Sequence, residues 1–275
     1  MSAPTAVEAP RRVGNVLPGG LLGRRAVHVI ERNVFTYRRT WPVFLTGFVE
    51  PVLYLLSIGI GVGALVGELP GPGGVPVPYQ TFVAPGLFAA AAMNGAVFDT
   101  TFSFFVKFKY FKTYDSMLAT PLGVADIAAG EAGWAVLRGT VYAGAFLLAM
   151  VVLGLVESWW AVFAVPSGAL IAFGFAGAGL AATTWMRSFI DFDYVNLAIV
   201  PLFLFSATFF PLEQYPDAVA SVVRWTPLYQ GVHLVRSLTL GDVGWELLVP
   251  VAYLGAMGLG GMVIAARRLA RLLLP

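Results

Sequence analysis

The sequence predicts an all-α polytopic membrane protein, and three observations carry that prediction. Of the 275 residues, 58% are hydrophobic and only 12% are charged, whereas soluble domains carry about 25% charged residues. Six apolar stretches are long enough to cross a bilayer, which takes about 20 residues in a helix. If these stretches cross the membrane, most Lys and Arg residues fall on one side of it, as the positive-inside rule requires.

The chain before the first apolar stretch divides into two parts. Residues 1–20 are rich in Pro and Gly and lack the apolar run of a secretory signal, so we expect a disordered cytoplasmic tail there. Residues 21–275 are expected to form one transmembrane domain. Within about Leu21–Arg39, apolar side chains recur at helical spacing and Arg fills the other faces, which predicts a basic amphipathic helix at the cytoplasmic interface. The apolar positions are Val27, Ile30, Val34 and Tyr37. This helix either anchors the chain to the membrane surface or also touches a partner.

Each predicted span is an apolar stretch, and several end at Trp or Tyr, residues that favour the membrane interface. The spans are about Val43–Gly63, Thr81–Phe105, Ala132–Leu155, Trp159–Met186, Val195–Leu212 and Trp245–Ala266.

Orientation follows from the basic residues. Most of the 17 Lys and Arg lie before the first span, between the second and third spans, or after the last one. Arg224 and Arg236 fall on the opposite side, and Arg138 lies inside a span. The positive-inside rule therefore places both termini in the cytoplasm.

The segment between the fifth and sixth predicted spans is too apolar for a free aqueous loop. Pro211, Pro216 and Pro227 divide it into short pieces. We expect two short helices on the outer side that re-enter the membrane, since irregular backbone at that depth must be shielded by protein or line a wet cavity.

The motifs of enzymes and of metal sites are missing from this sequence. It contains no phosphate-binding loop, no nucleophile elbow and no zinc-protease motif. It contains no Cys, and the predicted topology places His28 and His233 on opposite sides of the bilayer. We therefore expect no catalytic residue, no bound cofactor or metal, and no nucleic-acid partner. Any ATP-driven activity would depend on an ATPase that is a separate polypeptide.

Charged residues inside spans are rare and are functional candidates by default. Asp99, close to Phe102, lies in the second predicted span and Arg138 lies in the third. The two could form an intramembrane pair that joins helices, or one of them could face a central cavity. Glu50-Pro51 in the first span is interpreted as a structural kink. Near the end of the fifth span, Phe205 and Phe209 belong to a Phe-rich run that forms either a hydrophobic gate or ordinary packing.

The loop Lys107–Glu131 is the best candidate for a surface that receives force from a cytosolic partner. Tyr110 to Thr120 is predicted to form a short helix that ends before Pro121, because the residue before a proline disfavours the helical conformation. Its apolar side chains would fit a groove on another protein, while Lys112 and Asp115 stay in water. The candidate contacts are Tyr110, Phe111, Tyr114, Asp115, Met117, Leu118 and Pro121.

At this loop the sequence resembles a known family. The run Tyr114-Asp115-Ser116-Met117-Leu118-Ala119-Thr120-Pro121-Leu122, followed by Gly130-Glu131, is similar to the coupling region of the ABC type-two permeases. The nodulation (lipo-oligosaccharide export) and drug-resistance exporter branch is the most similar. Three further motifs match in the same order, and together the resemblance covers roughly residues 21–270. They are Glu50-Pro51-Val52-Leu53-Tyr54-Leu55, Phe82-Val83-Ala84-Pro85-Gly86-Leu87, and Phe209-Phe210-Pro211-Leu212-Glu213-Gln214 with Pro227-Leu228-Tyr229-Gln230-Gly231-Val232.

The resemblance implies a six-span permease subunit of a bacterial ABC exporter in the cytoplasmic membrane. It implies an elbow helix at about Leu21–Arg39, a coupling helix at about Tyr110–Thr120 and re-entrant outer helices within Tyr215–Leu240. Two ATPase subunits, which hold ATP and Mg, would act on two permeases, either identical copies or a copy and a paralogue. Substrates would be amphipathic: drugs, lipids or lipid-linked glycans.

Two other functions remain open from the sequence. One is an ion-coupled secondary transporter, a class that usually carries charges on broken helices and internal repeats. The other is a channel or structural membrane subunit without active transport.

Overall fold

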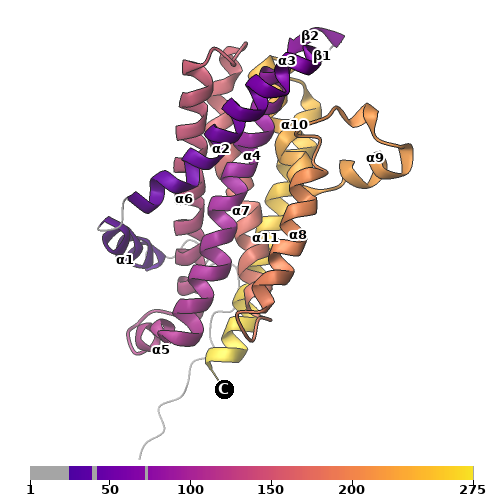
Figure 1. Ribbon diagram of the computed structural model, residues 1–275. Helices are drawn as coiled ribbons and strands as arrows, with labels where there is room; N and C mark the ends of the chain where they lie inside the picture. The colour runs from indigo at the N-terminus through magenta and orange to yellow at the C-terminus, as the bar shows by residue number, and fades with distance from the viewer. Residues whose placement is uncertain (1–24, 39–41, 72–73, 275) are drawn as a thin grey trace, which may run out of the picture.

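A computed structural model of the chain describes residues 25–38, 42–71 and 74–274 (Figure 1). Its regular structure is almost entirely helical, which confirms the all-α prediction. The predicted tail, residues 1–20, lies outside the described residues. The helices are α1 (Ala26–Arg38), α2 (Pro42–Gly61), α3 (Gly63–Val66), α4 (Tyr79–Phe98), α5 (Thr113–Leu118), α6 (Val124–Val152), α7 (Ala164–Thr183), α8 (Asp191–Leu204), α9 (Asp217–Arg224), α10 (Pro227–Leu240) and α11 (Leu248–Leu273).

Shorter elements connect these helices. Strands β1 (Glu68–Pro70) and β2 (Pro76–Pro78) pair antiparallel in a small hairpin between α3 and α4. Two π-helical segments, Asp99–Ser103 and Val106–Tyr110, prolong α4 toward α5. Single 3₁₀ turns are Trp159–Phe163, Leu212–Gln214 and Trp245–Leu247.

Five helical stretches among the described residues are long and apolar enough to cross a membrane. They correspond to the first four predicted spans and to the last one. Their bounds are Val49–Val66, Tyr79–Tyr110, Val124–Val152, Trp159–Thr183 and Trp245–Leu273.

The second span is the centre of the bundle. In its most apolar window 89% of the residues are buried, against 17% in the first span. Helix α4 packs against α2, α6, α7 and α10, so its apolar residues have no single outer face. The aromatic rings of Phe88 and Phe146 meet edge to face in this core, with centroids 6.5 Å apart.

Helices α7 and α11 pack closely against each other, and glycines make this possible. A side chain on Gly177 would collide with the backbone of Gly258, and one on Gly261 would collide with the backbone of Gly177. Small residues at a helix interface let two backbones approach closely, which is how helices associate in a membrane. We call Gly177, Gly258 and Gly261 the glycine seam.

The predicted fifth span, Val195–Leu212, is not confirmed as one continuous helix. Helix α8 has 14 residues, and the chain leaves the helical conformation after Leu204. Ala207 has a positive φ of 53°, and the hydroxyls of Ser206 and Thr208 hydrogen-bond to each other at 2.7 Å. A helix this short is below the length that a bilayer requires.

An arginine from α10 stabilises the irregular segment that follows α8. Arg236 donates from Nη2 to the carbonyl oxygen of Ala207 at 2.8 Å and from Nε to that of Phe82 at 3.3 Å. Its guanidinium also lies 3.9 Å from the centroid of the Phe82 ring. The first contact pairs a carbonyl group that the irregular segment would otherwise leave unsatisfied, and the second ties the same arginine to α4.

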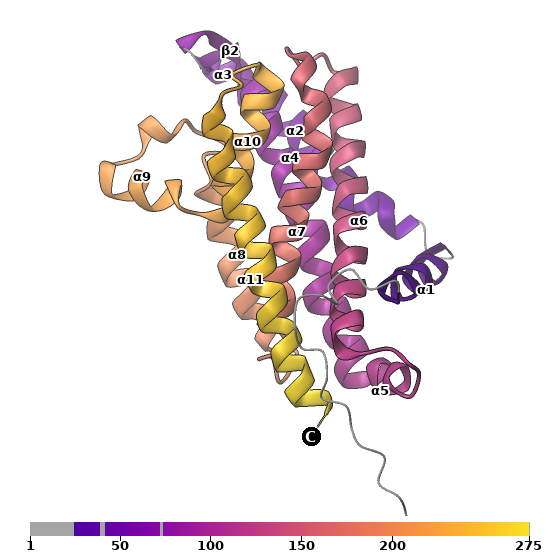
Figure 2. The same cartoon turned by 180° about the vertical axis from the view of Figure 1, so that it is seen from behind.

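Two short helices, α9 and α10, occupy the segment where two were predicted, but they are placed very differently. Helix α9 projects from the side of the bundle and buries only Val223 (Figures 1 and 2). Helix α10 packs against α4, α7 and α11 and buries most of its residues. The apolar character of this segment is therefore explained largely by α10.

The ends of the bundle differ. Helix α5 and the carboxyl end of α11 lie at one end, with α1 on the flank near it (Figures 1 and 2). The β-hairpin and α3 lie at the opposite end. A separate cluster of buried apolar residues, which includes Val29, Tyr114, Ile127 and Leu269, holds α1, α5, α6 and α11 together at the first end.

Candidate functional site

Helix α1 lies against α6 at a position prepared by a glycine. A Cβ on Gly130 would lie 2.5 Å from Cβ of Val29 and 2.9 Å from the carbonyl oxygen of Ala26. Real atoms do not approach that closely, so only glycine admits α1 here. Helix α1 is therefore packed on the protein along its length and does not merely rest on the membrane.

The face of α1 that packs on the bundle differs from the apolar face that was predicted to lie in the membrane interface. Ala26, Val29 and Asn33 are buried, whereas Val27 and Val34 are exposed. The prediction grouped apolar residues by helical spacing alone. The structure instead turns the polar Asn33 inward, because two charged residues of the bundle lie beneath it. The outward valines form an apolar strip beside the basic residues of the helix.

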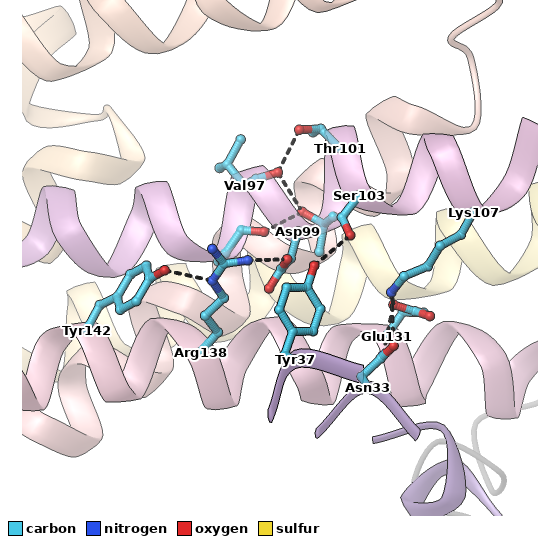
Figure 3. Close-up of polar contacts among 12 residues, drawn as sticks. Asn33, Tyr37, Val97, Asp99, Thr101, Ser103, Lys107, Glu131, Arg138 and Tyr142 are labelled. Atoms are coloured by element: carbon cyan, nitrogen blue, oxygen red, sulfur yellow. Dashed lines mark hydrogen bonds and ion pairs between the residues drawn. The ribbon is translucent and has the colours of Figure 1, made fainter. Parts of the chain in front are cut away.

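A polar cluster beneath α1 joins three elements (Figure 3). Lys107, from the π-helical extension of α4, lies 2.7 Å from the Glu131 carboxylate of α6. Asn33 donates to the same carboxylate oxygen at 3.3 Å and accepts from Lys107 Nζ at 3.1 Å. Buried charges are tolerated when they are paired and hydrogen-bonded. We call Asn33, Lys107 and Glu131 the polar clamp.

One turn further along α1, Tyr37 makes a second set of contacts. Its ring stacks on Trp134 of α6 with centroids 5.1 Å apart. Its hydroxyl lies 3.2 Å from Ser103 Oγ, in the first π-helical segment (Figure 3). The clamp and Tyr37 together hold α1 to both α6 and the extended α4.

Helix α5 is a short helix with a buried inner side. It follows Lys112, which adopts the left-handed conformation with φ 45°, so the chain turns sharply after the extended α4. Tyr114 is fully buried and its ring lies 5.0 Å from that of Phe104. Burial, and next the neighbouring Glu131 carboxylate, raise the pKa of Tyr114 well above its usual value, so this phenol stays neutral.

The expectation that every apolar residue of this helix faces a partner is wrong for two residues. Tyr114 and Met117 are buried in the cluster with Val29 and Ile127, because the short helix needs an apolar anchor of its own. The outer side consists of the remaining candidates. Tyr110, Phe111, Asp115 and Pro121 are exposed, and Leu118 is half-buried. We call these five residues the α5 outer surface.

A groove of about 390 Å³ runs between α1 and α5. One side carries His28 and Arg32 of α1, and the other carries Phe111 at the edge of the α5 outer surface. Arg25, just before α1, also links the two sides of the groove, because it donates to the carbonyl oxygen of Pro121 at 2.7 Å. Its lining is His28, Val29, Arg32, Phe111, Thr113, Ser116, Met117, Thr120 and Leu122.

Of the two possibilities left open for Asp99 and Arg138, the structure shows the ion pair. The carboxylate and guanidinium form a buried ion pair with 2.7 Å between Oδ1 and Nη1 (Figure 3). Arg138 Nε also donates to the hydroxyl of Tyr142 at 2.9 Å, and the guanidinium lies 5.4 Å from the ring of Phe98. The second carboxylate oxygen of Asp99 is buried and has no hydrogen-bond partner among the described residues.

The three phenylalanines predicted for a substrate pathway do not gather at this pair. Phe102 stacks on Phe98 and contacts Phe192 at the start of α8, with centroids 5.4 Å and 5.5 Å apart. Phe205 follows the other end of α8, which is about 20 Å away at ~1.5 Å per residue. Phe209 meets Phe203 edge to face at 5.3 Å. The pathway assignment of Asp99, Arg138, Phe102, Phe205 and Phe209 stays a prediction.

No group of three or more His, Asp or Glu side chains that suits a metal ion occurs in the described part of the chain. The buried carboxylates of Asp99 and Glu131 are instead paired with Arg138 and Lys107.

Asn33, Tyr37 and Lys107 were not predicted as site residues. One signal was available, because an Asn on the inward side of an amphipathic helix is out of pattern and requires a polar partner. Glu131 entered the sequence analysis only as part of a motif. Its partner Lys107 looked like one of several interfacial lysines, and their pairing depends on the fold.

The comparisons with known proteins agree with this architecture. Residues 25–240 match the family model described as ABC-2 type transporter. The chain is 32% identical over 227 residues to nodulation protein J of Rhizobium leguminosarum bv. trifolii, covering 82% of this chain and 84% of the relative. It is 30% identical over 228 residues to nodulation protein J of Rhizobium leguminosarum bv. viciae, covering 82% and 85%. With nodulation protein J of Sinorhizobium fredii the identity is 30% over 231 residues, covering 83% and 86%.

The family model spans well over half of the chain, and it includes α1, α5, the polar clamp and the Asp99–Arg138 pair. A bundle with several apolar helices of membrane-crossing length is the architecture expected of a multi-pass permease component. The chain therefore belongs to the ABC-2 type transporter family.

Proposed function

We propose that this chain is the permease subunit of an ATP-driven exporter, and that a separate ATPase pushes on the α5 outer surface. One observation carries the proposal. Phe111, just before α5, and Asp115 within α5 are exposed, whereas Tyr114 and Met117 on the other side of this helix are fixed in the protein core. A load applied to the outside of such a helix moves the structure behind it and is not absorbed by a flexible loop.

The contacts behind α5 provide the route for that load. The buried hydroxyl of Tyr114 lies beside Glu131 of α6. Glu131 is also bound to Lys107 and Asn33, so one displacement acts on α6, α1 and the extended α4 together. Packed side chains and buried ion pairs of this kind have discrete arrangements, which is what a two-state transporter requires.

The groove between α1 and α5 is a second surface that the ATPase would contact, next to the α5 outer surface. Its wall carries the basic Arg32 on one side and apolar Phe111 on the other. An ATPase segment with both apolar and acidic side chains would complement it. In this arrangement α1 is an elbow helix that also touches the partner.

Two permeases and two ATPases, with ATP and Mg on the ATPases, form the proposed assembly. Helices α2 and α8 are its natural inner surface, because the first span is the least buried of the five and α8 buries none of its residues. Together with the extended α4 they would line a cavity shared with a second copy or a paralogue. The apolar character of these helices favours amphipathic substrates such as drugs, lipids or lipid-linked glycans.

The topology that goes with this function has six spans in the bacterial cytoplasmic membrane. Helix α8 with the segment to Phe210 forms the additional span, and Arg236 satisfies its irregular backbone. Both termini and α5 face the cytoplasm, by the distribution of Lys and Arg. Helices α9 and α10 then lie toward the outer side as the re-entrant pair.

Co-purification followed by reconstitution tests the proposal. The tagged chain is expected to recover an ATPase in equal amounts, and vesicles with both proteins are expected to transport an amphipathic dye only when ATP is supplied. Transport by the permease alone, driven by an ion gradient, would establish the secondary-transporter alternative. Absence of both an ATPase partner and any flux would leave a non-transporting subunit.

A further inference from the structure

A second cavity, of about 470 Å³, lies between α4, α7 and α8 and takes no part in the proposed coupling. Its volume falls within the roughly 300–1,000 Å³ of ordinary ligand pockets. The lining residues are Val97, Thr101, Phe175, Ala178, Gly179, Ala182, Trp185, Met186, Asp191, Tyr194, Val195, Ala198, Ile199 and Leu202.

Almost the whole wall of this cavity is hydrocarbon. The hydroxyl of Thr101 is within the wall, but it donates to the carbonyl oxygen of Val97 at 2.7 Å and needs no other partner. Trp185 and Tyr194, which favour the membrane interface, and the charged Asp191 come from the stretch where α7 leads into α8. Apolar cavities stay dry and accept apolar ligands, so the occupant that fits is a hydrocarbon chain.

Helix α8 is held loosely enough for such a chain to enter. None of its residues is buried, in contrast to α7, which contributes the opposite wall. Pro201 also removes one backbone hydrogen bond within the helix. A hydrocarbon chain between α8 and α7 would complete the packing that the protein does not supply.

The polar end of the cavity carries positive charge. The Arg268 guanidinium of α11 lies 3.9 Å from the centroid of the Trp185 ring, and its Nε donates to Thr184 Oγ1 at 3.0 Å. Arg187 lies in the adjacent turn. Neither arginine forms an ion pair within residues 25–38, 42–71 and 74–274. The nearby Asp191 carboxylate is already engaged, since it accepts from the backbone N–H of Arg187 and of Ser188 at 2.5 Å and 3.0 Å.

We propose that this cavity binds one acyl chain of an anionic phospholipid from the surrounding bilayer, with the phosphate near Arg268 and Arg187. Arg is well suited to hold a phosphate group because its planar guanidinium donates two parallel hydrogen bonds. The lipid acts as a wedge between α8 and α7 and is not the transported substrate. The proposal therefore stands or falls independently of the ATP-driven function.

Photolabelling of the full-length chain in phosphatidylcholine nanodiscs tests this site. The probe is phosphatidylglycerol with a diazirine in one acyl chain, and mass spectrometry locates the labelled residues. In the unmodified protein we expect label on the cavity-facing residues of α7 and α8, such as Ala182 and Ala198. Label confined to the outer faces of α2 and α11 would overturn the proposal without requiring any variant.

Two substitutions on the same helix provide a matched comparison. Ala198→Trp fills the cavity and is expected to reduce labelling at Ala182 at least fivefold. Leu197→Trp places the same ring on the exposed side of α8 and is expected to leave labelling at Ala182 unchanged. Equal labelling of both variants would refute the assignment of the acyl chain to this cavity.

The headgroup is tested with Arg268→Gln and a second probe. This substitution is expected to lower labelling by the phosphatidylglycerol probe severalfold, and to leave labelling by a phosphatidylcholine probe with the same diazirine chain unchanged. If both probes label the unmodified protein equally, the preference for an anionic headgroup is wrong.

Discussion

Lys107 and Glu131 form a buried ion pair, with Nζ 2.7 Å from Oε2, across the two ends of the segment that contains α5. The pair closes this segment at its base, so α5 is presented by a closed loop and not by a free linker. Asn33 reaches the same carboxylate from α1, which makes Glu131 the point where three elements meet. Loss of the Glu131 carboxylate should therefore disturb all three elements at once.

Replacing Glu131 by Ala is expected to destabilise the protein by about 3–5 kcal/mol, because the substitution leaves the largely buried Lys107 without its carboxylate and only Asn33 to accept from it. Thermal unfolding in detergent measures the loss. The matched control is Asp193→Ala, an acidic residue that is exposed and forms no ion pair among the described residues. The double variant Lys107→Met/Glu131→Met is expected to recover most of the stability. A double variant no more stable than Glu131→Ala would contradict this account of the polar clamp.

The contact between α1 and α6 predicts opposite effects for two glycines of the same helix. Gly130→Ala is expected to cost about 1–3 kcal/mol, because the new Cβ meets Val29 and forces α1 outward. Gly144→Ala meets no atom within 4 Å, and it is expected to be neutral or to stabilise α6 by up to about 1 kcal/mol. The same unfolding assay measures both. If the two variants behave alike, α1 is not packed on Gly130 as described.

The two sides of α5 are expected to respond differently to substitution. Phe111→Ser and Asp115→Arg change only exposed side chains, so stability stays within about 0.5 kcal/mol of the parent. ATP-driven transport in vesicles with the partner ATPase is expected to fall at least tenfold. Leu118→Arg is expected to uncouple transport in the same way.

Tyr114→Ala, on the buried side of α5, is the comparison for the substitutions on its outer side. It removes a fully buried ring and is expected to cost about 3–5 kcal/mol of stability. If Phe111→Ser and Asp115→Arg both transport normally while the complex assembles, the α5 outer surface is not the contact for the ATPase.

The pair Asp99–Arg138 can be separated into a structural and a transport role. Asp99→Leu alone leaves the arginine buried without its carboxylate and is expected to cost about 3–5 kcal/mol. The double variant Asp99→Leu/Arg138→Met replaces both charges and is expected to regain stability in the unfolding assay. Transport by the double variant then distinguishes the two roles. Normal transport would show that the pair only joins helices, whereas loss with a stable fold would place it on the pathway.

Much of the bundle could be predicted from hydrophobicity alone. The five long spans are continuous apolar helices, and their positions follow from the length that a bilayer demands. The end of α8 could not be predicted this way, because the residues from Phe205 to Phe210 are as apolar as a helix but take irregular backbone. That choice depends on Arg236, which comes from a later helix and satisfies the carbonyl group of Ala207.

The candidate site was predicted less completely than the fold. Helical spacing predicted helices at α1 and α5 but did not indicate that Asn33 and Tyr114 face inward, because the reasons lie elsewhere in the chain. Asn33 and Glu131 are 98 residues apart in sequence, and nothing local indicates that they meet. The Asp99–Arg138 pair was predictable, since two opposite charges in adjacent apolar spans have few other ways to be satisfied.

The glycine seam between α7 and α11 has a mechanical consequence. Gly177 meets Gly258 and Gly261 backbone to backbone, so the two helices pack as one tight unit. A larger side chain along the seam would collide with the facing backbone and force the two helices apart. The seam therefore sets the separation of α7 and α11 along the middle of the bundle.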